Sequence, residues 1–180
     1  MTEGIEVRRV RADEWERVRD LRIAAVTDPN AAIAFLTTPE QERAHDEAHW
    51  RKRAADAASG DATAQLIAEA EGDWVGTATV LVRPAGTTDH TGRTVYHRRA
   101  DVVGVFVRAD HRGQGVIDAL LDAAAGWTAS LGLTRLTLDV HTQNTRAQAA
   151  YRRCGFVPTG VTFTSTIGPE LEMARSLSPQ

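Results

Sequence analysis

The sequence has too little of several features that would place it in other classes of protein. Cys154 is its one cysteine, which excludes an intramolecular disulfide and a zinc site built from cysteines. No apolar run approaches the roughly 20 residues that a membrane-spanning helix needs. Neither sign of charge dominates, since the formal net charge is only −3, so no overall field would attract nucleic acid or an anionic membrane. The amino-terminal segment has no apolar signal core, and we therefore expect a cytoplasmic protein.

The length and composition predict one compact globular domain over residues 1–180. A chain of 180 residues can bury a substantial core but is short for two domains. The apolar and charged fractions are ordinary for a globular protein, and no repeat or linker interrupts the chain.

Local sequence signals predict alternating strands and helices. Asp13 and Glu16 have the spacing of a capping box, and the helix that they begin should end before Pro29. Gly132 stands where the cap of a later helix belongs. The predicted elements are a strand at 5–10, helices at 13–28 and 38–60, a hairpin of strands at 65–70 and 74–83, a loop at 84–94, a strand at 99–107, a helix at 116–131, a strand at 133–140, a helix at 144–154 and a last strand at 171–177.

This order of elements predicts an α/β fold with a mixed sheet. The strand–helix–strand unit over residues 99–140 predicts a parallel pair joined by a right-handed crossover. The hairpin before it predicts antiparallel neighbours. Helices on both faces of the sheet are the simplest arrangement that buries the apolar residues.

A loop with two glycines joins the valine-rich strand at 99–107 to the next helix. The first amides of a helix lack intrahelical acceptors, and the helix dipole makes that end partly positive. Gly113 and Gly115 let the backbone approach an anion closely, which favours phosphate binding. On its own this loop is equally well explained as a tight turn. It is neither Gly-x-Gly-x-x-Gly nor followed by Gly-Lys-Ser/Thr, so dinucleotide and Walker-type binding are not supported.

A second motif follows after one more strand. It reads Asn144-x-x-Ala147-x-x-x-Tyr151-x-x-x-Gly155-Phe156. With the glycine loop, it resembles the GNAT superfamily of N-acetyltransferases, which pairs Arg/Gln-x-x-Gly-x-Gly/Ala with this later motif in the same order. The resemblance implies a GNAT-like fold and transfer of acetyl from acetyl-CoA to a primary amine by direct attack.

The resemblance also implies a role for individual residues. Tyr151 would deliver a proton to the departing thiolate, because a phenol of pKa about 10 is matched to a thiol of pKa about 8.5. Asn144 would bind the pantetheine arm near the reacting end. The implied cofactor contacts are Val105, Phe106 and Val107 for the pantetheine arm, with backbone groups of the two valines, and the loop residues Arg112, Gly113, Gln114, Gly115, Val116 and Ile117 for the pyrophosphate.

One position departs from the family pattern. Ile117 stands where the family usually has glycine or alanine. Its amide is kept, but the branched side chain would crowd the pyrophosphate, so we expect an effect on cofactor affinity.

The base that deprotonates the amine is less strongly indicated. Asp101, at the head of the central strand, is the first choice because acids recur there in similar proteins. A role as a turn residue at the end of the strand explains the aspartate at this position equally well. Asp139 and His141, near the end of the next strand, are alternatives.

Other features leave the partners open. His45 and His49 have a spacing that can bind a metal, but no third ligand is evident, so we expect no metal. The acceptor is an amine-bearing small molecule or peptide of unknown identity, and the resemblance makes a homodimer through the carboxy-terminal strands plausible. The alternative function is a GNAT-like module that binds or senses acyl-CoA without turnover.

Overall fold

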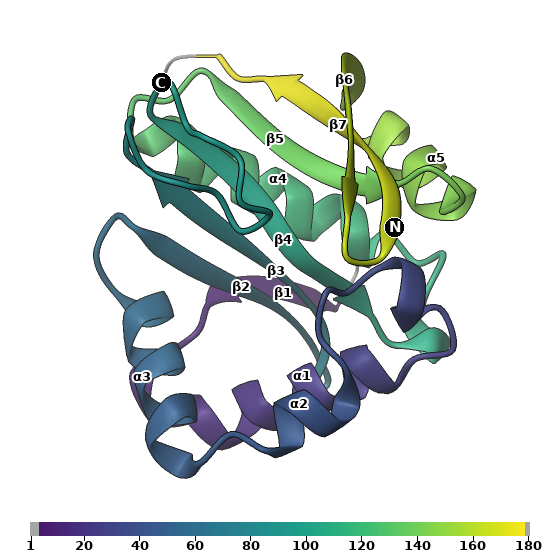
Figure 1. Ribbon diagram of the computed structural model, residues 1–180. Coiled ribbons are helices and arrows are strands. Elements are labelled where there is room, and N and C mark those ends of the chain that lie inside the picture. Colours follow the sequence, from purple (N-terminus) through teal and green to yellow (C-terminus); the bar gives the residue numbers. More distant parts are fainter. Residues whose placement is uncertain (1–3, 179–180) are drawn as a thin grey trace.

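One seven-stranded mixed sheet with helices on both faces forms the described part of the chain (Figure 1). The computed structural model describes residues 4–178, and the predicted 1–180 domain extends beyond them at both ends. The strand order is β1-β2-β3-β4-β5-β7-β6, with β4 and β5 parallel and all other neighbours antiparallel. The predicted fold class is therefore confirmed. The strands are β1 (Ile5–Arg9), β2 (Thr63–Ala70), β3 (Asp73–Arg83), β4 (Arg99–Val107), β5 (Arg135–His141), β6 (Val157–Ser165) and β7 (Gly168–Ser176). The α-helices are α1 (Trp15–Thr27), α2 (Pro39–Arg43), α3 (Glu47–Ala58), α4 (Val116–Ser130) and α5 (Thr145–Arg153), and the 3-10 helices are η1 (Ala12–Glu14), η2 (Ala31–Ile33) and η3 (Ala109–His111).

The two faces of the sheet bury two separate hydrophobic clusters. On β2, Leu66 and Ala68 belong to the cluster under α4 and α5, whereas Ile67 between them belongs to the cluster under α1 and α3. This alternation follows from the two-residue period of a strand. The second cluster includes Trp50, which is 1% exposed. Both faces are therefore covered, as the predicted architecture requires.

The predicted helix at 38–60 is two helices. It begins as expected, since the Thr38 hydroxyl accepts a hydrogen bond from the amide of Gln41 (3.3 Å) and proline occupies the first helical position. The chain leaves the helix after Arg43, and the Asp46 carboxylate then accepts from the amide of His49 (2.9 Å). An aspartate that can cap a new helix favours this break.

One other predicted boundary is wrong, and one strand was not predicted. The first helix is α1 from Trp15, and Glu14 rather than Glu16 reaches back, accepting from the Arg11 amide (2.8 Å). Strand β6 was not predicted, because Pro158 and Gly160 interrupt its pattern and most of its side chains are exposed. It lies at the edge of the sheet, where proline is tolerated.

Strand β4 contains one extra residue near its middle. Phe106 pairs with Thr77 of β3, but Val103 already pairs with Thr79, so the register shifts between these pairs. Gly104 lies at this bulge with φ 61°, a conformation that glycine adopts without strain. The extra residue changes which side chains face α4: Val102 does so before the bulge, and Val105 does so after it.

The parallel pair β4–β5 separates at the same place. The two strands pair only from Ala100 with Leu136 to Val102 with Leu138. Beyond these residues the second half of β4 has β3 on one side and no strand on the other among the described residues. An open strand edge therefore lies in the middle of the sheet.

The seating of α4 on β3 can be tested at Gly76. A methyl group there would lie 2.9 Å from Cγ1 of Val116, 3.0 Å from the Phe106 carbonyl oxygen and 3.1 Å from Cδ1 of Leu120. We expect Gly76→Ala to lower the free energy of unfolding by about 1–3 kcal/mol in denaturant titrations. The matched control is Gly126→Ala on α4, where a methyl group meets nothing within 4 Å. The control should raise stability by about 0.5–1 kcal/mol, and equal effects of the two substitutions would contradict the packing.

Candidate active site

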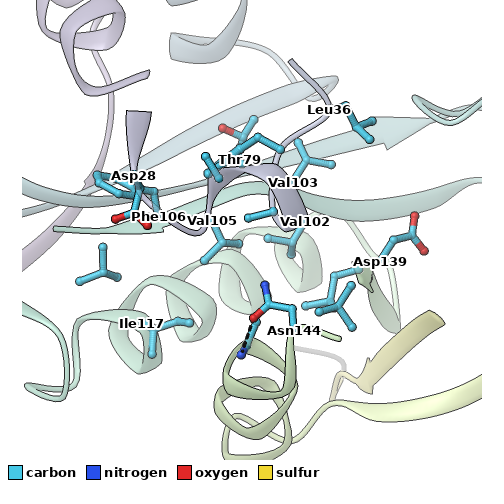
Figure 2. Close-up of a pocket in the computed structure, with 18 of the residues that line it drawn as sticks. Asp28, Leu36, Thr79, Val102, Val103, Val105, Phe106, Ile117, Asp139 and Asn144 are labelled. Carbon is cyan, nitrogen blue, oxygen red and sulfur yellow. Dashed lines mark hydrogen bonds between the residues drawn. The ribbon is translucent and has the colours of Figure 1, made fainter. Parts of the chain in front are cut away.

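A cavity of about 1060 Å³ opens along the separated half of β4. Figure 2 shows it extending from Ile117 on the first turn of α4, past Phe106 and Val105, to Asp139 on β5. Asn144 at the start of α5 lies across from β4 in the same view. The separation of β4 from β5 and the glycine loop are thus two parts of one cavity wall.

The glycine loop exposes a run of backbone donors. Gly113 and Gly115 have φ values of 76° and 82°, and Gly115 is the N-cap of α4. None of the backbone amides of residues 113–118 donates a hydrogen bond to an acceptor within residues 4–178. These amides and the positive end of the α4 dipole are suited to an anion such as a phosphate.

Arg112 anchors this loop through its side chain. Its Nε donates to the carbonyl oxygen of Val107 (2.8 Å), and its guanidinium is paired with the Asp28 carboxylate. Asp28 follows α1, so the pair connects the first helix to the glycine loop. The sequence had suggested Arg112 only as a donor of its amide.

Ile117 lies on the cavity wall and is partly buried. Its side chain packs against the cluster under α4, which includes Leu121 and Val140. This contact explains why a branched side chain is accommodated there. The expected effect on cofactor affinity stays a prediction.

Asn144 and Tyr151 both line the cavity from α5. The Asn144 side chain caps the helix, accepting from the amide of Ala147 (3.2 Å), and its Nδ2 donates to the Ile33 carbonyl oxygen (3.5 Å). Tyr151 is 8% exposed and packs beside Phe156, with ring centroids 6.2 Å apart. Burial raises the pKa of the Tyr151 phenol above its usual value, so it keeps its proton at neutral pH.

Asp101 is placed differently from Tyr151. It is 1% exposed, accepts hydrogen bonds from Arg99 (Nε, 2.8 Å) and from the Thr137 hydroxyl, and lies before the β4 bulge. It is not among the residues that line the cavity within the described chain. Its Oδ1 is therefore held in a polar cluster, and its Oδ2, although buried without a partner within residues 4–178, lies away from the cavity.

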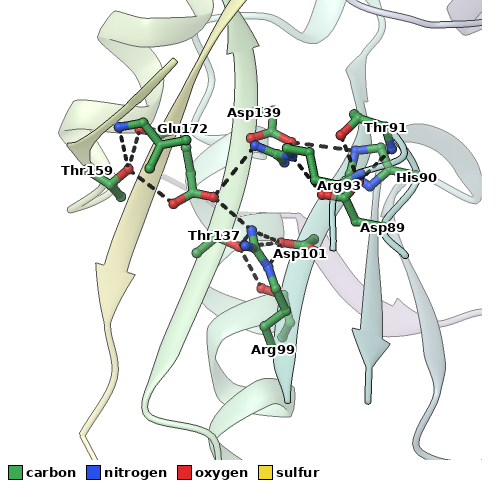
Figure 3. Close-up of polar contacts among 12 residues, drawn as sticks. Asp89, His90, Thr91, Arg93, Arg99, Asp101, Thr137, Asp139, Thr159 and Glu172 are labelled. Carbon is green, nitrogen blue, oxygen red and sulfur yellow. Dashed lines mark hydrogen bonds and ion pairs between the residues drawn. The ribbon is translucent and has the colours of Figure 1, made fainter. Parts of the chain in front are cut away.

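Asp139 is the carboxylate that reaches both this cluster and the cavity (Figure 3). Its Oδ2 accepts from Nη2 of Arg93 (2.6 Å), whereas its Oδ1 is buried without a hydrogen-bond partner in the described chain. Burial raises the pKa of Asp139 to about 7; Arg93 opposes this, and the neighbouring carboxylates Asp101 and Glu172 add to it. A carboxyl group that titrates near neutral pH inside a cavity is suited to exchange a proton.

The loop between β3 and β4 supplies the partner of Asp139. The Asp89 carboxylate accepts from the amide and side chain of Thr91 and from the amide of Arg93, which fixes the loop tip. Arg93 then bridges Asp89 (2.8 Å) and Asp139. His90 and Thr91 consequently line the cavity. Sequence reasoning missed these roles, since the segment has only the composition of an exposed loop.

His141, the other alternative base, already uses its acceptor nitrogen in a hydrogen bond. Its Nδ1 accepts from the amide of Gln143 (3.1 Å), so the neutral ring carries its proton on Nε2. It lines the cavity but offers no ring nitrogen as an acceptor in this state. Asp139 is the better placed of the two.

Comparison with known proteins identifies the family. The sequence model of the Acetyltransferase (GNAT) family matches residues 15–156. The chain belongs to the GNAT family. This confirms the resemblance seen in the two motifs, both of which lie inside the matched range.

Two curated acetyltransferases are similar to part of this GNAT chain. It is 34% identical over 94 residues to aminoglycoside N(6')-acetyltransferase type 1 of Stenotrophomonas maltophilia, covering 52% of this chain and 59% of that one. It is 33% identical over 73 residues to streptothricin acetyltransferase of Escherichia coli, covering 40% of this chain and 42% of that one. The matches thus span less than two thirds of these relatives' own lengths.

Solved structures share the fold of this GNAT chain. A GNAT-family acetyltransferase from Streptococcus pneumoniae superimposes with a TM-score of 0.73 at 19% identity, covering 97% of this chain and 99% of that chain. A phosphinothricin acetyltransferase from Sinorhizobium meliloti, solved in complex with AcCoA, gives a TM-score of 0.72 at 20% identity, covering 97% and 89%. At such identities the likeness concerns the fold.

Neither a membrane helix nor a metal cluster is found in the described residues. No helix in residues 4–178 has both the length and the apolar character needed to cross a bilayer. The same residues hold no group of three or more His, Cys, Asp or Glu side chains placed to bind a metal ion.

The structure predicts that Cys154 is inert. Its Sγ is 3.2 Å from Oδ1 of Asp118, and burial followed by this acidic neighbour raises the pKa of the thiol to about 12. We expect iodoacetamide at pH 8 to alkylate the native protein at least about 100-fold more slowly than the denatured chain, measured by mass spectrometry. Labelling at comparable rates would show an accessible thiolate and reopen the question of a covalent intermediate.

Proposed function

We propose that this protein transfers an acetyl group from acetyl-CoA to a primary amine of a small acceptor. The observation that carries the proposal is the continuity of one cavity from the unpaired amides of residues 113–118, along the open edge of β4, to Tyr151 and Asp139. The family supports the reaction class, and the named relatives act on amine-bearing small molecules according to their names.

The cofactor-binding roles follow the path of the cavity. The loop amides from Gly113 to Ile117 would hold the pyrophosphate at the amino end of α4. The pantetheine arm would lie along Val105–Val107 as an added strand, because this half of β4 lacks a neighbour on one side. Asn144 lies across the cavity from β4, where its side chain would hydrogen-bond the arm near the reacting end.

The chemistry needs proton transfer at the amine and at the sulfur, and the cavity offers a group for each. Asp139 accepts a proton from the incoming ammonium, which frees the amine to attack the thioester carbon. The oxyanion takes hydrogen bonds from a backbone amide of the open half of β4. Tyr151 donates its proton to the sulfur as the carbon–sulfur bond breaks, and the proton that the attacking nitrogen then loses restores the phenol. Asp139 therefore replaces Asp101 in the proposed role of base.

A non-catalytic acyl-CoA sensor would need only the first half of this cavity. Oδ1 of Asp139, which has no partner within residues 4–178, serves no purpose in cofactor binding along Val105–Val107, since Asp139 lies at the opposite end of the cavity from Ile117. The enzyme is therefore favoured over the sensor.

Tyr151→Phe separates the two functions. The substitution removes the phenolic proton but keeps the packing against Phe156. We expect kcat to fall by about 10²–10⁴-fold with an amine acceptor, while the calorimetric Kd for acetyl-CoA stays the same. Desulfo-CoA should bind comparably, and NAD should not bind. Unchanged turnover would remove Tyr151 from the mechanism, and no binding of acetyl-CoA to the wild type would remove the proposed function.

The role of Asp139 predicts a pH dependence. Only its carboxylate form accepts a proton, so kcat/KM should rise with pH and level off above an apparent pKa of about 7. Asp139→Asn should lower kcat/KM by about 10²–10⁴-fold and abolish this titration. Asp101→Asn is the comparison variant, and it should retain the rise near pH 7. A larger loss of kcat/KM in Asp101→Asn, with the pH profile abolished, would return the role of base to Asp101.

A further inference from the structure

Two arginines lie together on the cavity wall above β2 and β3. Arg22 comes from α1 and Arg53 from α3, and both line the cavity. Arg22 is well paired: its Nε donates to Oε1 of Glu42 (2.7 Å) and its Nη2 to the Thr37 hydroxyl (2.8 Å). It therefore uses two of its five donors within the described chain.

Arg53 is not paired in this way. Its nearest carboxylate oxygen, Oε2 of Glu42, is 4.0 Å from Nη1, beyond hydrogen-bond distance. No nitrogen of its guanidinium donates a hydrogen bond to an atom of residues 4–178, and the group lies over the Trp50 ring at 5.5 Å. A guanidinium carries five donors, so this is a large unused capacity on the wall of a cavity.

The charges at this wall do not balance. Arg22 and Arg53 share the single carboxylate of Glu42, which leaves one positive charge over. Burial and then Arg22 lower the pKa of Arg53 to about 10, with Glu42 opposing them, so Arg53 stays charged at neutral pH. The neighbouring His49, whose Nε2 is also buried without a partner in the described chain, offers no negative charge.

A small side cavity marks where these arginines meet the sheet. It measures about 10 Å³, close to the space that one water occupies, and its lining includes Arg22, Arg53 and the polar side chains of Gln65 and Thr79. Gly104 of the β4 bulge also lines it, and a methyl group there would lie 3.7 Å from Nη1 of Arg22. The positive wall therefore reaches the point where β4 opens.

The other end of the cavity has the opposite surplus. Around Asp139, the carboxylates of Asp89, Asp101 and Glu172 are met by the guanidiniums of Arg93 and Arg99 (Figure 3). Glu170, which also lines the cavity, adds a further carboxylate, so acids outnumber the paired arginines. An ammonium group is favoured at this acidic end and an anion at the Arg53 end. One acceptor that carries an ammonium group and an anionic group would match both ends of the cavity.

Resting on the proposed function, we infer that the acceptor is a small amino acid whose carboxylate binds Arg53 while its amine is directed toward Asp139. A guanidinium binds a carboxylate through two parallel hydrogen bonds, which would use the idle donors of Arg53. The surplus positive charge at the same wall disfavours acceptors whose groups are all cationic, since like charges there would repel.

The test compares matched acceptors on the wild type and on Arg53→Gln. Each α- or ω-amino acid of the panel is paired with its carboxamide and with the amine that lacks the carboxylate, and acetyl transfer is measured with acetyl-CoA. We expect the wild type to prefer an amino acid over both analogues by at least about tenfold in kcat/KM. In Arg53→Gln the KM for that amino acid should rise about 10–100-fold, with little change in its kcat. The KM and kcat for either analogue should also change little.

Arg51→Gln is the matched control. Arg51 lies on the same helix, but its side chain is exposed, pairs with Glu47 (2.6 Å) and is not part of the cavity wall. This variant should behave as the wild type. Melting temperature and the Kd for acetyl-CoA check that Arg53→Gln is folded, and if it is not, the preference of the wild type between matched acceptors decides the matter.

The outcomes separate this inference from the proposed function. Turnover that favours the carboxamides or simple amines, or that falls equally for all three acceptors in Arg53→Gln, would overturn the carboxylate site and leave the acetyltransferase intact. If acetyl-CoA binds but no amine is acetylated, the proposed function fails instead. Calorimetric titration of the amino acids into the complex with desulfo-CoA then tests the site: binding that Arg53→Gln abolishes supports it, and no binding to the wild type overturns it.

Discussion

The separation of β4 from β5 is the constraint on which the rest of the molecule depends. Three paired positions hold the two strands together, and the extra residue at Gly104 turns the second half of β4 away from β5. An open edge inside a sheet leaves backbone groups without partners, which is costly unless a ligand supplies them. The glycine loop, α4 and α5 surround that edge, so the proposed cofactor and acceptor sites belong to one cavity.

Much of the fold could be predicted because its signals are local. The valine-rich central strand, the crossover helix α4 and the hairpin follow from periodicity and turn residues, and the structure has each of them. The break between α2 and α3 depends on Asp46, a capping residue whose signal was present but outweighed by an alanine-rich helical pattern. Strand β6 was hidden because an edge strand with exposed side chains needs little apolar alternation.

The site was predictable only where a motif carried it. The glycine loop, Asn144 and Tyr151 come together on one cavity as the resemblance implied, although their roles remain to be measured. Asp101 shows where sequence reasoning fails: Arg99 is two residues away on the same face of the strand and takes its carboxylate. Asp139 and Arg53 gain their importance from tertiary contacts, since nothing in the local sequence shows that a charged side chain lines a cavity and is poorly paired there.

Helix α1 connects two distant parts of the cavity wall. Arg22 projects from it toward the acceptor wall, and Asp28, just past its last turn, holds Arg112 of the phosphate loop. A displacement of this helix on cofactor binding would be felt at the acceptor wall, and thermodynamic linkage requires the reverse effect to be equal in free energy. Through this one helix, occupancy of either site would bias the affinity of the other.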